Sequence, residues 1–245
     1  MRFIDCTWEI ANIGHRTCEI SYEIGEEFNK VELLEKTQSF EYIVVKVPMN
    51  HPVINIGLAG LGFVLIETQI NISKKFKDFN FNDRLVKQLY PHVTEQIVST
   101  EGELDVVLNR MTPNMFSTDR IYLDPYFSPE TSRNRYANWV KTEFLKGSSD
   151  LKRIMYNGED IGFFMSREHE GVLDGLLGGI YEGRQSEGLG FLTACSCFIS
   201  AYKNNNPFKK VFTAISSNNV PMWQIYDYLQ FKIDKMNYVF VKHND

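Results

Sequence analysis

The stretch Gln185-Ser186-Glu187-Gly188-Leu189-Gly190 leads directly into an apolar segment at residues 191–202 that has the composition of a helix. A strand-like run at residues 176–181 precedes it. Glycines at the fourth and sixth positions allow the backbone to turn its amide N–H groups inward, and the following helix adds the positive end of its dipole. The stretch therefore predicts a strand, a phosphate-binding loop and a helix, in that order.

A second segment follows at the distance that a further strand and helix require. An apolar strand is expected at residues 211–215, and Asn219 and Tyr226 come after it, seven residues apart. Together the two segments resemble the GCN5-related N-acetyltransferase (GNAT) family, in which Gln or Arg, two residues, Gly, one residue, and Gly or Ala are followed later by Asn and Tyr. Residues at the matching positions are Gln185, Gly188, Gly190, Asn219 and Tyr226. The family's usual Leu-Gly-Phe is Leu229-Gln230-Phe231 here, which casts doubt on the local helix C-cap.

The resemblance implies an α/β fold with a mixed central sheet, in which two strands splay apart and helices flank the sheet. It implies that acetyl-CoA inserts at the splay and pairs with the backbone near Ile180 and Tyr181, where an amide would bind the oxyanion. Asn219 would bond the pantetheine arm, and Tyr226, with an ordinary pKa near ~10, would protonate the leaving thiolate. The residues that would hold the pyrophosphate are Gln185, Ser186, Glu187, Gly188, Leu189 and Gly190.

Each of these residues also has a purely structural interpretation. Gly188 and Gly190 could close a tight turn, and Asn219 could cap a helix. Tyr226 follows Trp223 by three residues, which is the spacing of an apolar helix face. A general base is not assigned, because the candidates lie in an expected loop where solvated charges are the simpler interpretation. Those candidates are Glu168, His169 and Glu170.

Composition favours a cytoplasmic enzyme without a protein-built metal site. The chain has 245 residues, 43% of them hydrophobic, and a net charge of −5 with no basic stripe, which argues against nucleic acid as a partner. No apolar run approaches the ~20 residues of a membrane span, and the first residues lack the apolar region of a signal peptide. The five histidines show no HxxxH or HExxH grouping, and the four cysteines show no CxxC spacing, so we expect reduced, buried thiols and no metal.

Two parts are predicted along the chain, residues 1–84 and residues 85–245. The first is interpreted as a smaller α/β half of a GNAT fold that lacks the phosphate loop, with strands at residues 17–22, 42–47 and 63–72 and helices at 26–36 and 52–61. A chance β-α-β likeness remains open. The second is the acetyl-CoA-binding part: a strand at residues 93–98, a capping box at Thr100 and Glu103, a helix that begins at Pro129, and a hairpin through Asn157-Gly158.

A finer resemblance concerns the acceptor. Trp8, Leu61-Gly62-Phe63, the block Tyr126-Phe127-Ser128-Pro129-Glu130 and the run from Arg135 to Val140 look like the dTDP-fucosamine N-acetyltransferase group, which acetylates the amine of a nucleotide-linked deoxyaminosugar. That likeness implies acetyl-CoA and an amine acceptor as partners, direct attack in a ternary complex, and allows a homodimer. The alternatives are an acceptor that is a peptide, a lysine or a small amine, a CoA-binding module without turnover, and a nucleotide-binding protein. The last is disfavoured because neither a Walker lysine nor GxGxxG is present.

Overall fold

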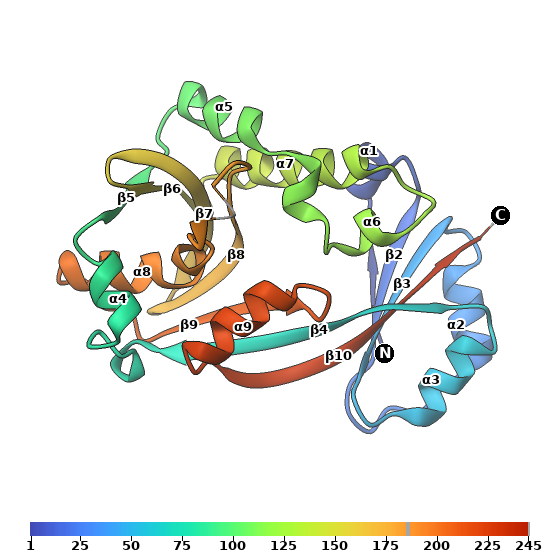
Figure 1. Ribbon diagram of the computed structural model, residues 1–245. Helices are drawn as coiled ribbons and strands as arrows, with labels where there is room; N and C mark the ends of the chain where they lie inside the picture. The colour runs from blue at the N-terminus through green and yellow to red at the C-terminus, as the bar shows by residue number, and fades with distance from the viewer. Residues whose placement is uncertain (185–186, 245) are drawn as a thin grey trace.

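A ten-stranded mixed sheet runs through the whole molecule (Figure 1). The computed structural model describes residues 1–184 and 187–244. The strand order is β1-β2-β3-β10-β4-β9-β8-β7-β6-β5, in which β2–β3 and β8–β9 are parallel pairs. The strands are β1 (Arg2–Asp5), β2 (Thr17–Ser21), β3 (Tyr42–Pro48), β4 (Val64–Lys75), β5 (Val93–Ile97), β6 (Asp150–Tyr156), β7 (Glu159–His169), β8 (Val172–Ile180), β9 (Lys210–Ser216) and β10 (Lys232–His243).

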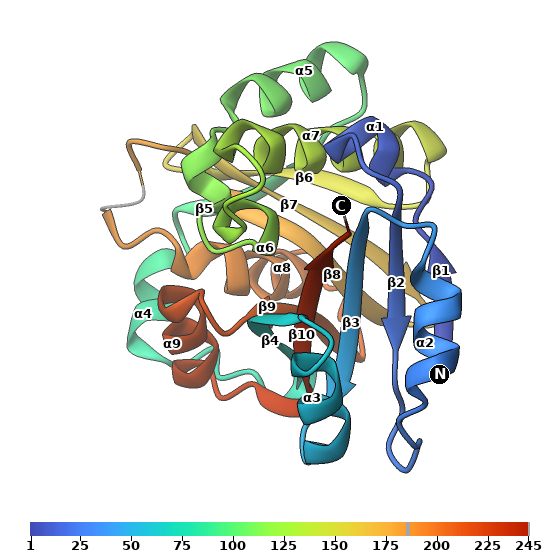
Figure 2. The ribbon, with the colours of Figure 1, turned by 90° about the vertical axis from the view of Figure 1, so that its right-hand side faces the viewer.

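Helices cover both faces of this sheet (Figures 1 and 2). Over β6, β7 and β8, one face carries α5 and α7, and the other carries α8, which packs with α4 and α9 in the largest apolar cluster. Helices α2 and α3 cover one face of β2 and β3, and α1 and α6 pack against β3 and β10. The helices are α1 (Glu9–Ile13), α2 (Lys30–Thr37), α3 (Pro52–Ala59), α4 (Arg84–Leu89), α5 (Glu101–Arg110), α6 (Arg120–Leu123), α7 (Pro129–Lys146), α8 (Phe191–Lys203) and α9 (Val220–Tyr228), with 3-10 turns η1 (Phe76–Asp78) and η2 (Pro113–Phe116).

The parallel pair β8–β9 separates part-way along its length. Cα partners run only from Val172 opposite Lys210 to Gly175 opposite Thr213, although β8 continues to Ile180 and β9 to Ser216. A register shift between β7 and β8 occurs at the same place, between Met165 and Ser166, so that Leu176 is the extra residue of a β-bulge. The bulge bends β8 away from β9. The predicted fold class, a mixed sheet with splayed strands between helices, is confirmed.

The last strand, β10, lies between β3 and β4, both of which precede residue 84 in the chain. Strand β4 in turn pairs with β9. The two predicted parts therefore share one sheet, and each fills a gap between strands of the other (Figure 2). The division at residue 84 stays a prediction about folding units.

Several local expectations are met, and others need correction. The capping box of α5 forms, with the Thr100 side chain accepting from the Glu103 amide and the Glu103 carboxylate accepting from the Thr100 amide. The first helix expected in the N-terminal part, at residues 26–36, begins later, at Lys30, because Asn29 caps it by accepting from the Glu32 amide at 3.2 Å. The doubtful C-cap of α9 is resolved by Gln230, which adopts the left-handed backbone (φ 56°) that glycine usually provides.

The four cysteines Cys6, Cys18, Cys195 and Cys197 are buried and free, as expected. Burial raises the pKa of the Cys6 thiol to about 11 and that of Cys18 to about 12. Across the described residues, no helix has the length and apolar character needed to cross a membrane.

Candidate functional site

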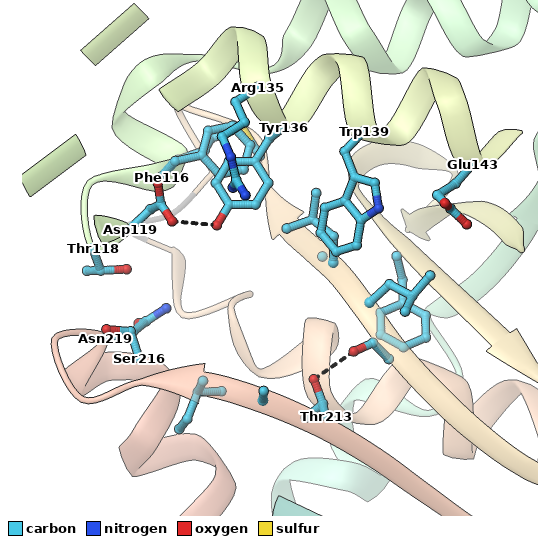
Figure 3. Close-up of a pocket in the computed structure, with 18 of the residues that line it drawn as sticks. Phe116, Thr118, Asp119, Arg135, Tyr136, Trp139, Glu143, Thr213, Ser216 and Asn219 are labelled. Atoms are coloured by element: carbon cyan, nitrogen blue, oxygen red, sulfur yellow. Dashed lines mark hydrogen bonds between the residues drawn. The ribbon is translucent and has the colours of Figure 1, made fainter. Parts of the chain in front are cut away.

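A cavity of about 1160 Å³ lies between α7 and the sheet, and Thr193 of α8 and Tyr226 of α9 also line it. Helix α7 and the segment before α6 form one wall, and β4, β8 and β9 form the other. Figure 3 shows Tyr136, Trp139 and Glu143 on α7, on the side of the cavity that faces β9, which carries Thr213 and Ser216. The splay between β8 and β9 opens into this cavity, since Leu176, Leu177 and Gly178 line it on one side and Ala214, Ile215 and Ser216 on the other.

Backbone alternation identifies which amides of β8 face the splay. The Tyr181 amide donates to the Ile161 carbonyl of β7 at 2.9 Å. In an antiparallel pair every second residue bonds the same partner strand, so the amides of Gly179 and Leu177 are directed to β7 as well. The amide of Gly178 is then directed to the other side, into the splay. Sequence reasoning missed Gly178, although a Gly-Gly pair within a strand is a signal of close backbone approach.

Ile180 and Tyr181, the residues expected to pair with the pantetheine arm, are buried and are not among the residues that line the cavity. The Tyr181 backbone is engaged within the chain, because its carbonyl also accepts from the Arg184 amide at 3.1 Å. Its ring lies under the Arg110 guanidinium, 3.8 Å from the ring centroid. Pairing of a ligand with Tyr181 stays a prediction, and it would require these bonds to be exchanged.

The predicted phosphate loop connects β8 to α8. Gln185 and Ser186 lie outside the described residues. Gly188 has φ +72°, a conformation that favours glycine, and a Cβ there would meet nothing within 4 Å. Gly190 is the N-cap of α8, with ordinary φ, and Leu189 is buried. Glu187 pairs with Arg184 at 2.8 Å, and Arg184 also pairs with Glu159, so this guanidinium is near the loop but already neutralised.

Asn219 caps α9, and it also lines the cavity. Its Oδ1 accepts from the Met222 amide at 3.2 Å, which confirms the capping interpretation. The capping bond uses only the side-chain oxygen, so the amide nitrogen retains its donor function. Figure 3 shows Ser216 and Asn219 across the cavity from Thr118 and Asp119. Contact with a pantetheine arm stays a prediction that this position allows.

Tyr226 belongs to both the apolar core and the cavity lining. Its ring packs edge-on against Phe231, with 4.7 Å between centroids. Burial raises the pKa of this phenol well above the ordinary value of ~10 expected from the sequence, and the neighbouring Cys197 adds to the shift. The Tyr226 hydroxyl therefore keeps its proton at neutral pH and can serve as a donor.

Glu67 of β4 is a carboxylate on the cavity wall that the sequence did not single out. Burial raises its pKa, although the nearby Arg120 and a hydrogen bond from Ser216 oppose the shift. Hydrogen bonds on both sides fix its position: Asn218 donates to the Ile66 carbonyl at 3.2 Å, and Ser217 exchanges bonds of 2.9 and 2.8 Å with Thr68. Glu67 is thus held in register with the loop that leads to Asn219.

Other titratable candidates fit less well. His169 and Glu170 are at the β7–β8 turn with side chains 85% and 80% exposed, and Glu168 is exposed beside them, so the solvated interpretation of all three agrees with their positions. Asp174 lines the cavity, and burial raises its pKa against the effect of Arg167. It lies opposite Phe212, where β8 and β9 are still paired, rather than at the splay.

A hydrogen-bonded network closes the cavity beside α6. Asp119 accepts from the Tyr136 hydroxyl at 2.8 Å, the Ser132 hydroxyl at 3.1 Å and the Ile121 amide at 3.0 Å (Figure 3 shows the Tyr136 bond). Arg135 forms a bidentate pair with Glu9 of α1, at 2.6 to 3.0 Å. These bonds join α1, α6 and α7 into one wall. Among the residues of known placement, no group of three His, Cys, Asp or Glu is arranged to hold a metal ion.

Comparison with known proteins identifies this arrangement of strands. No protein-family profile and no curated protein matches the sequence. Solved structures do match over nearly the whole chain. A functionally unknown conserved protein from Staphylococcus epidermidis has TM-score 0.60 and 15% identity, over 94% of this chain and 84% of that one. A GCN5-related N-acetyltransferase from Kribbella flavida has TM-score 0.57 and 12% identity, over 94% and 82%.

A tandem GNAT protein from the clavulanic acid biosynthesis pathway is similar over 93% of this chain and 75% of its own length, with TM-score 0.55 and 13% identity. The chain has the GNAT fold. Because these matches cover more than nine-tenths of the chain, the likeness includes the N-terminal strands as well as the segment with the loop motif. At such low identity the likeness establishes the fold, and the chemistry has to be argued from this chain's own cavity.

Proposed function

We propose that the protein is an N-acetyltransferase that moves an acetyl group from acetyl-CoA to a primary amine. The observation that carries the proposal is the splay of β8 and β9, which opens into a cavity lined by Asn219 and Tyr226. A splay leaves backbone amide and carbonyl groups of both strands without strand partners, and an extended amide-containing chain such as pantetheine can pair with them. The GNAT fold of the solved N-acetyltransferases supports the same conclusion.

The proposed reaction is direct attack of the amine on the thioester in a ternary complex. The amine nitrogen forms a bond to the carbonyl carbon, and the C–S bond then breaks to release CoA. The amide of Gly178 would donate to the oxyanion, and Tyr226 would give its proton to the departing thiolate. Glu67 would take the proton that the amine loses, because burial raises the pKa of its carboxyl group and so makes its carboxylate a stronger base than an exposed one.

The cofactor-binding part of the proposal keeps the residues expected from the sequence. Glu187, Gly188, Leu189 and Gly190, with Gln185 and Ser186, would hold the pyrophosphate at the N-terminus of α8. Gly188 provides the left-handed turn that such a loop requires. Asn219 would donate to the pantetheine arm while capping α9. The proposed reaction needs no metal, because a backbone amide stabilises the oxyanion and proton transfers neutralise the thiolate and the amine.

For the acceptor, we propose a nucleotide-linked deoxyaminosugar, as the finer sequence resemblance implies. A cavity of about 1160 Å³ has room for a large acceptor beside the thioester, and Trp8, Tyr136 and Trp139 offer aromatic surfaces for a ring. A peptide or another small amine remains the alternative acceptor.

The experiment that tests the proposal separates cofactor binding from turnover. Calorimetry should show binding of acetyl-CoA, and thiol release should follow when amines are added from a panel of nucleotide-linked aminosugars, polyamines and peptides. Binding without thiol release for every amine would indicate a CoA-binding module instead. Absence of CoA binding by the folded protein would overturn the proposal.

A further inference from the structure

Arg120 is a cationic side chain in the cavity that the proposed reaction does not use. It is the first residue of α6 and lines the cavity. Its Nε is buried without a hydrogen-bond partner, and among the described residues its guanidinium takes part in no ion pair. A buried N–H without an acceptor is costly, because it has lost its bond to water without gaining one within the protein.

The acidic groups around Arg120 do not supply the missing bond. Burial opposes its charged form, but Tyr42, Asp119, Glu67 and Glu19 outweigh burial, so the pKa of Arg120 is raised and it stays charged. Two of these groups bond elsewhere: Asp119 accepts from Tyr136, Ser132 and Ile121, and Glu19 pairs with Lys46 at 3.0 Å. These groups therefore keep Arg120 charged, and its Nε–H is left without an acceptor.

Arg135, the other guanidinium that lines the cavity, shows the contrast. Both Glu9 oxygens accept from it. Its role is to join α7 to α1, because its Nε and Nη2 both donate to Glu9. Among the residues of known placement, Arg120 is thus the cavity guanidinium that is charged and takes part in no ion pair.

We propose that Arg120 binds a carboxylate or phosphate group of the amine acceptor. The inference rests on the proposed N-acetyltransferase function and narrows its acceptor class. A guanidinium presents paired N–H donors that match the oxygens of either anion. Glu67 lies close enough to Arg120 to interact with it electrostatically, so the wall offers a negative site for the amine and a positive site for the anion.

An acceptor of this class carries an amine together with an anionic group. Amino acids, aminosugar phosphates and nucleotide-linked aminosugars belong to it, whereas polyamines and neutral aminosugars do not. Because Arg120 is recessed among β4, α6 and α7, recognition of the anion would orient the amine before attack rather than only attract it from solution.

The test uses acceptors in matched pairs that differ only in the anion. One arm compares an aminosugar 1-phosphate or nucleotide-linked aminosugar with the free aminosugar, and the other compares an amino acid with its amide. We expect kcat/KM for the anionic member to be at least about 10-fold higher in one arm, the usual scale for a charged hydrogen-bonded contact. The arm that shows the preference identifies the source of the anion. Equal kcat/KM within both pairs would overturn the inference.

Variants then assign the preference to Arg120. Arg120→Gln should remove the preference for the anionic acceptor, chiefly by raising KM. Arg120→Lys should keep part of the preference, because lysine keeps the charge but lacks the paired N–H donors of the guanidinium. The matched control is Arg84→Gln, because Arg84 also begins a short helix behind an aspartate N-cap but lies exposed on the helix that packs with α8. A preference that survives Arg120→Gln would refute the assignment. If Arg120→Gln does not fold, the assignment is tested with Arg120→Lys, by the ratio of kcat/KM for the anionic acceptor to kcat/KM for its neutral partner.

Failure of this inference can be told apart from failure of the proposed function. Acetyl transfer to amines without any anion preference leaves the function standing and removes the role of Arg120. Loss of all transfer, with no CoA binding by the folded protein, removes the function and the inference with it.

Discussion

Tyr226 lies at the border between the apolar core and the cavity, and its two roles make different predictions. Replacement by Phe keeps the ring and its contact with Phe231, and removes only the hydroxyl. As the acid for the thiolate, Tyr226→Phe should lower turnover by roughly 10²-fold while acetyl-CoA affinity is kept. As a core residue alone, it should change stability by about 1 kcal/mol and leave turnover unaltered. Thiol release and melting temperature, measured on one preparation, distinguish the two.

Glu67 gives a prediction about pH. Because burial raises its pKa, the rate should fall as pH drops through that pKa, where the base becomes protonated. Ser216→Ala removes a hydrogen bond that favours the carboxylate, so the acidic limb of kcat/KM should move to higher pH. Glu67→Gln should abolish that limb and much of the turnover. A limb that stays in place in both variants would show that another group titrates.

The same raised pKa predicts how Glu67 affects stability. A carboxyl group whose pKa is higher in the folded than in the unfolded state stabilises the fold while it is protonated, and this contribution is lost as pH rises through the folded value. Once Glu67 is ionised, its burial therefore lowers the stability of the fold. Glu67→Gln should leave the melting temperature unchanged or raise it, while Glu67→Gln at acidic pH should show no such gain.

Gly188 tests the phosphate loop. Gly188→Glu introduces both a side chain and a negative charge where the pyrophosphate is expected, and it should abolish CoA binding. Its control is Gly183→Glu, since Gly183 has a similarly positive φ of 91°, open space around its Cβ and the same β8–α8 connection. Both variants carry a left-handed strain of roughly 1–2 kcal/mol. Calorimetry that finds equal CoA affinity in the two folded variants would contradict the loop assignment.

The sequence predicts a residue's role well when that role depends on its neighbours in the chain, and poorly when it depends on residues far away in the chain. The capping role of Asn219, given from the sequence as the structural alternative to binding pantetheine, could be seen there because the bond to Met222 is made within four residues. Gly178, Glu67 and Arg120 were not found, because their importance depends on strand register and on elements far away in the chain. A charged residue within a strand is normally interpreted as facing solvent, and the burial of Glu67 depends on the packing of α6 against β4.

Helix α5 contains a capping box that is visible in the sequence and that we expect to affect stability without affecting the candidate site. Its capping box satisfies the Thr100 and Glu103 amides at the start of the helix. Thr100→Ala should cost about 1 kcal/mol of stability. Acetyl transfer should be unchanged at temperatures where the variant is folded, because Thr100 is not among the residues that line the cavity. A denaturation curve with kinetic constants checks both statements.

Element boundaries followed the strength of the local pattern. Strand β3 is predicted almost to the residue. Both of its faces are buried, so its sequence is a continuous apolar run from Tyr42 to Val47 with clear ends. Short elements were missed, among them β1, α1 and α4, since four to six residues hold too little periodicity. The splay of β8 and β9 was expected only from the family resemblance. The sequence of neither strand indicates the residue at which their pairing ends.

At the scale of the whole molecule, β10 lies between β3 and β4, and β4 lies between β10 and β9. We therefore predict that residues 1–84 and residues 85–245 need each other in order to fold. Without residues 85–245, both β3 and β4 lose β10, and without residues 1–84, β9 and β10 lose β4. Either fragment alone should fail to unfold cooperatively, and co-expressed fragments should purify together. Circular dichroism and CoA binding of the separate fragments check this. A fragment 85–245 that folds and binds CoA alone would establish it as an independent domain.

The position of β10 also has a consequence for synthesis on the ribosome. Translation delivers β3 and β4 early and β10 after every other strand of this sheet, so β3 and β4 wait for the strand that lies between them. At ordinary rates of elongation the wait lasts roughly 10 to 30 s. During that interval their backbone edges are open to pairing with other chains. Nascent chains stalled before residue 232 should therefore hold chaperones longer than chains released after residue 243.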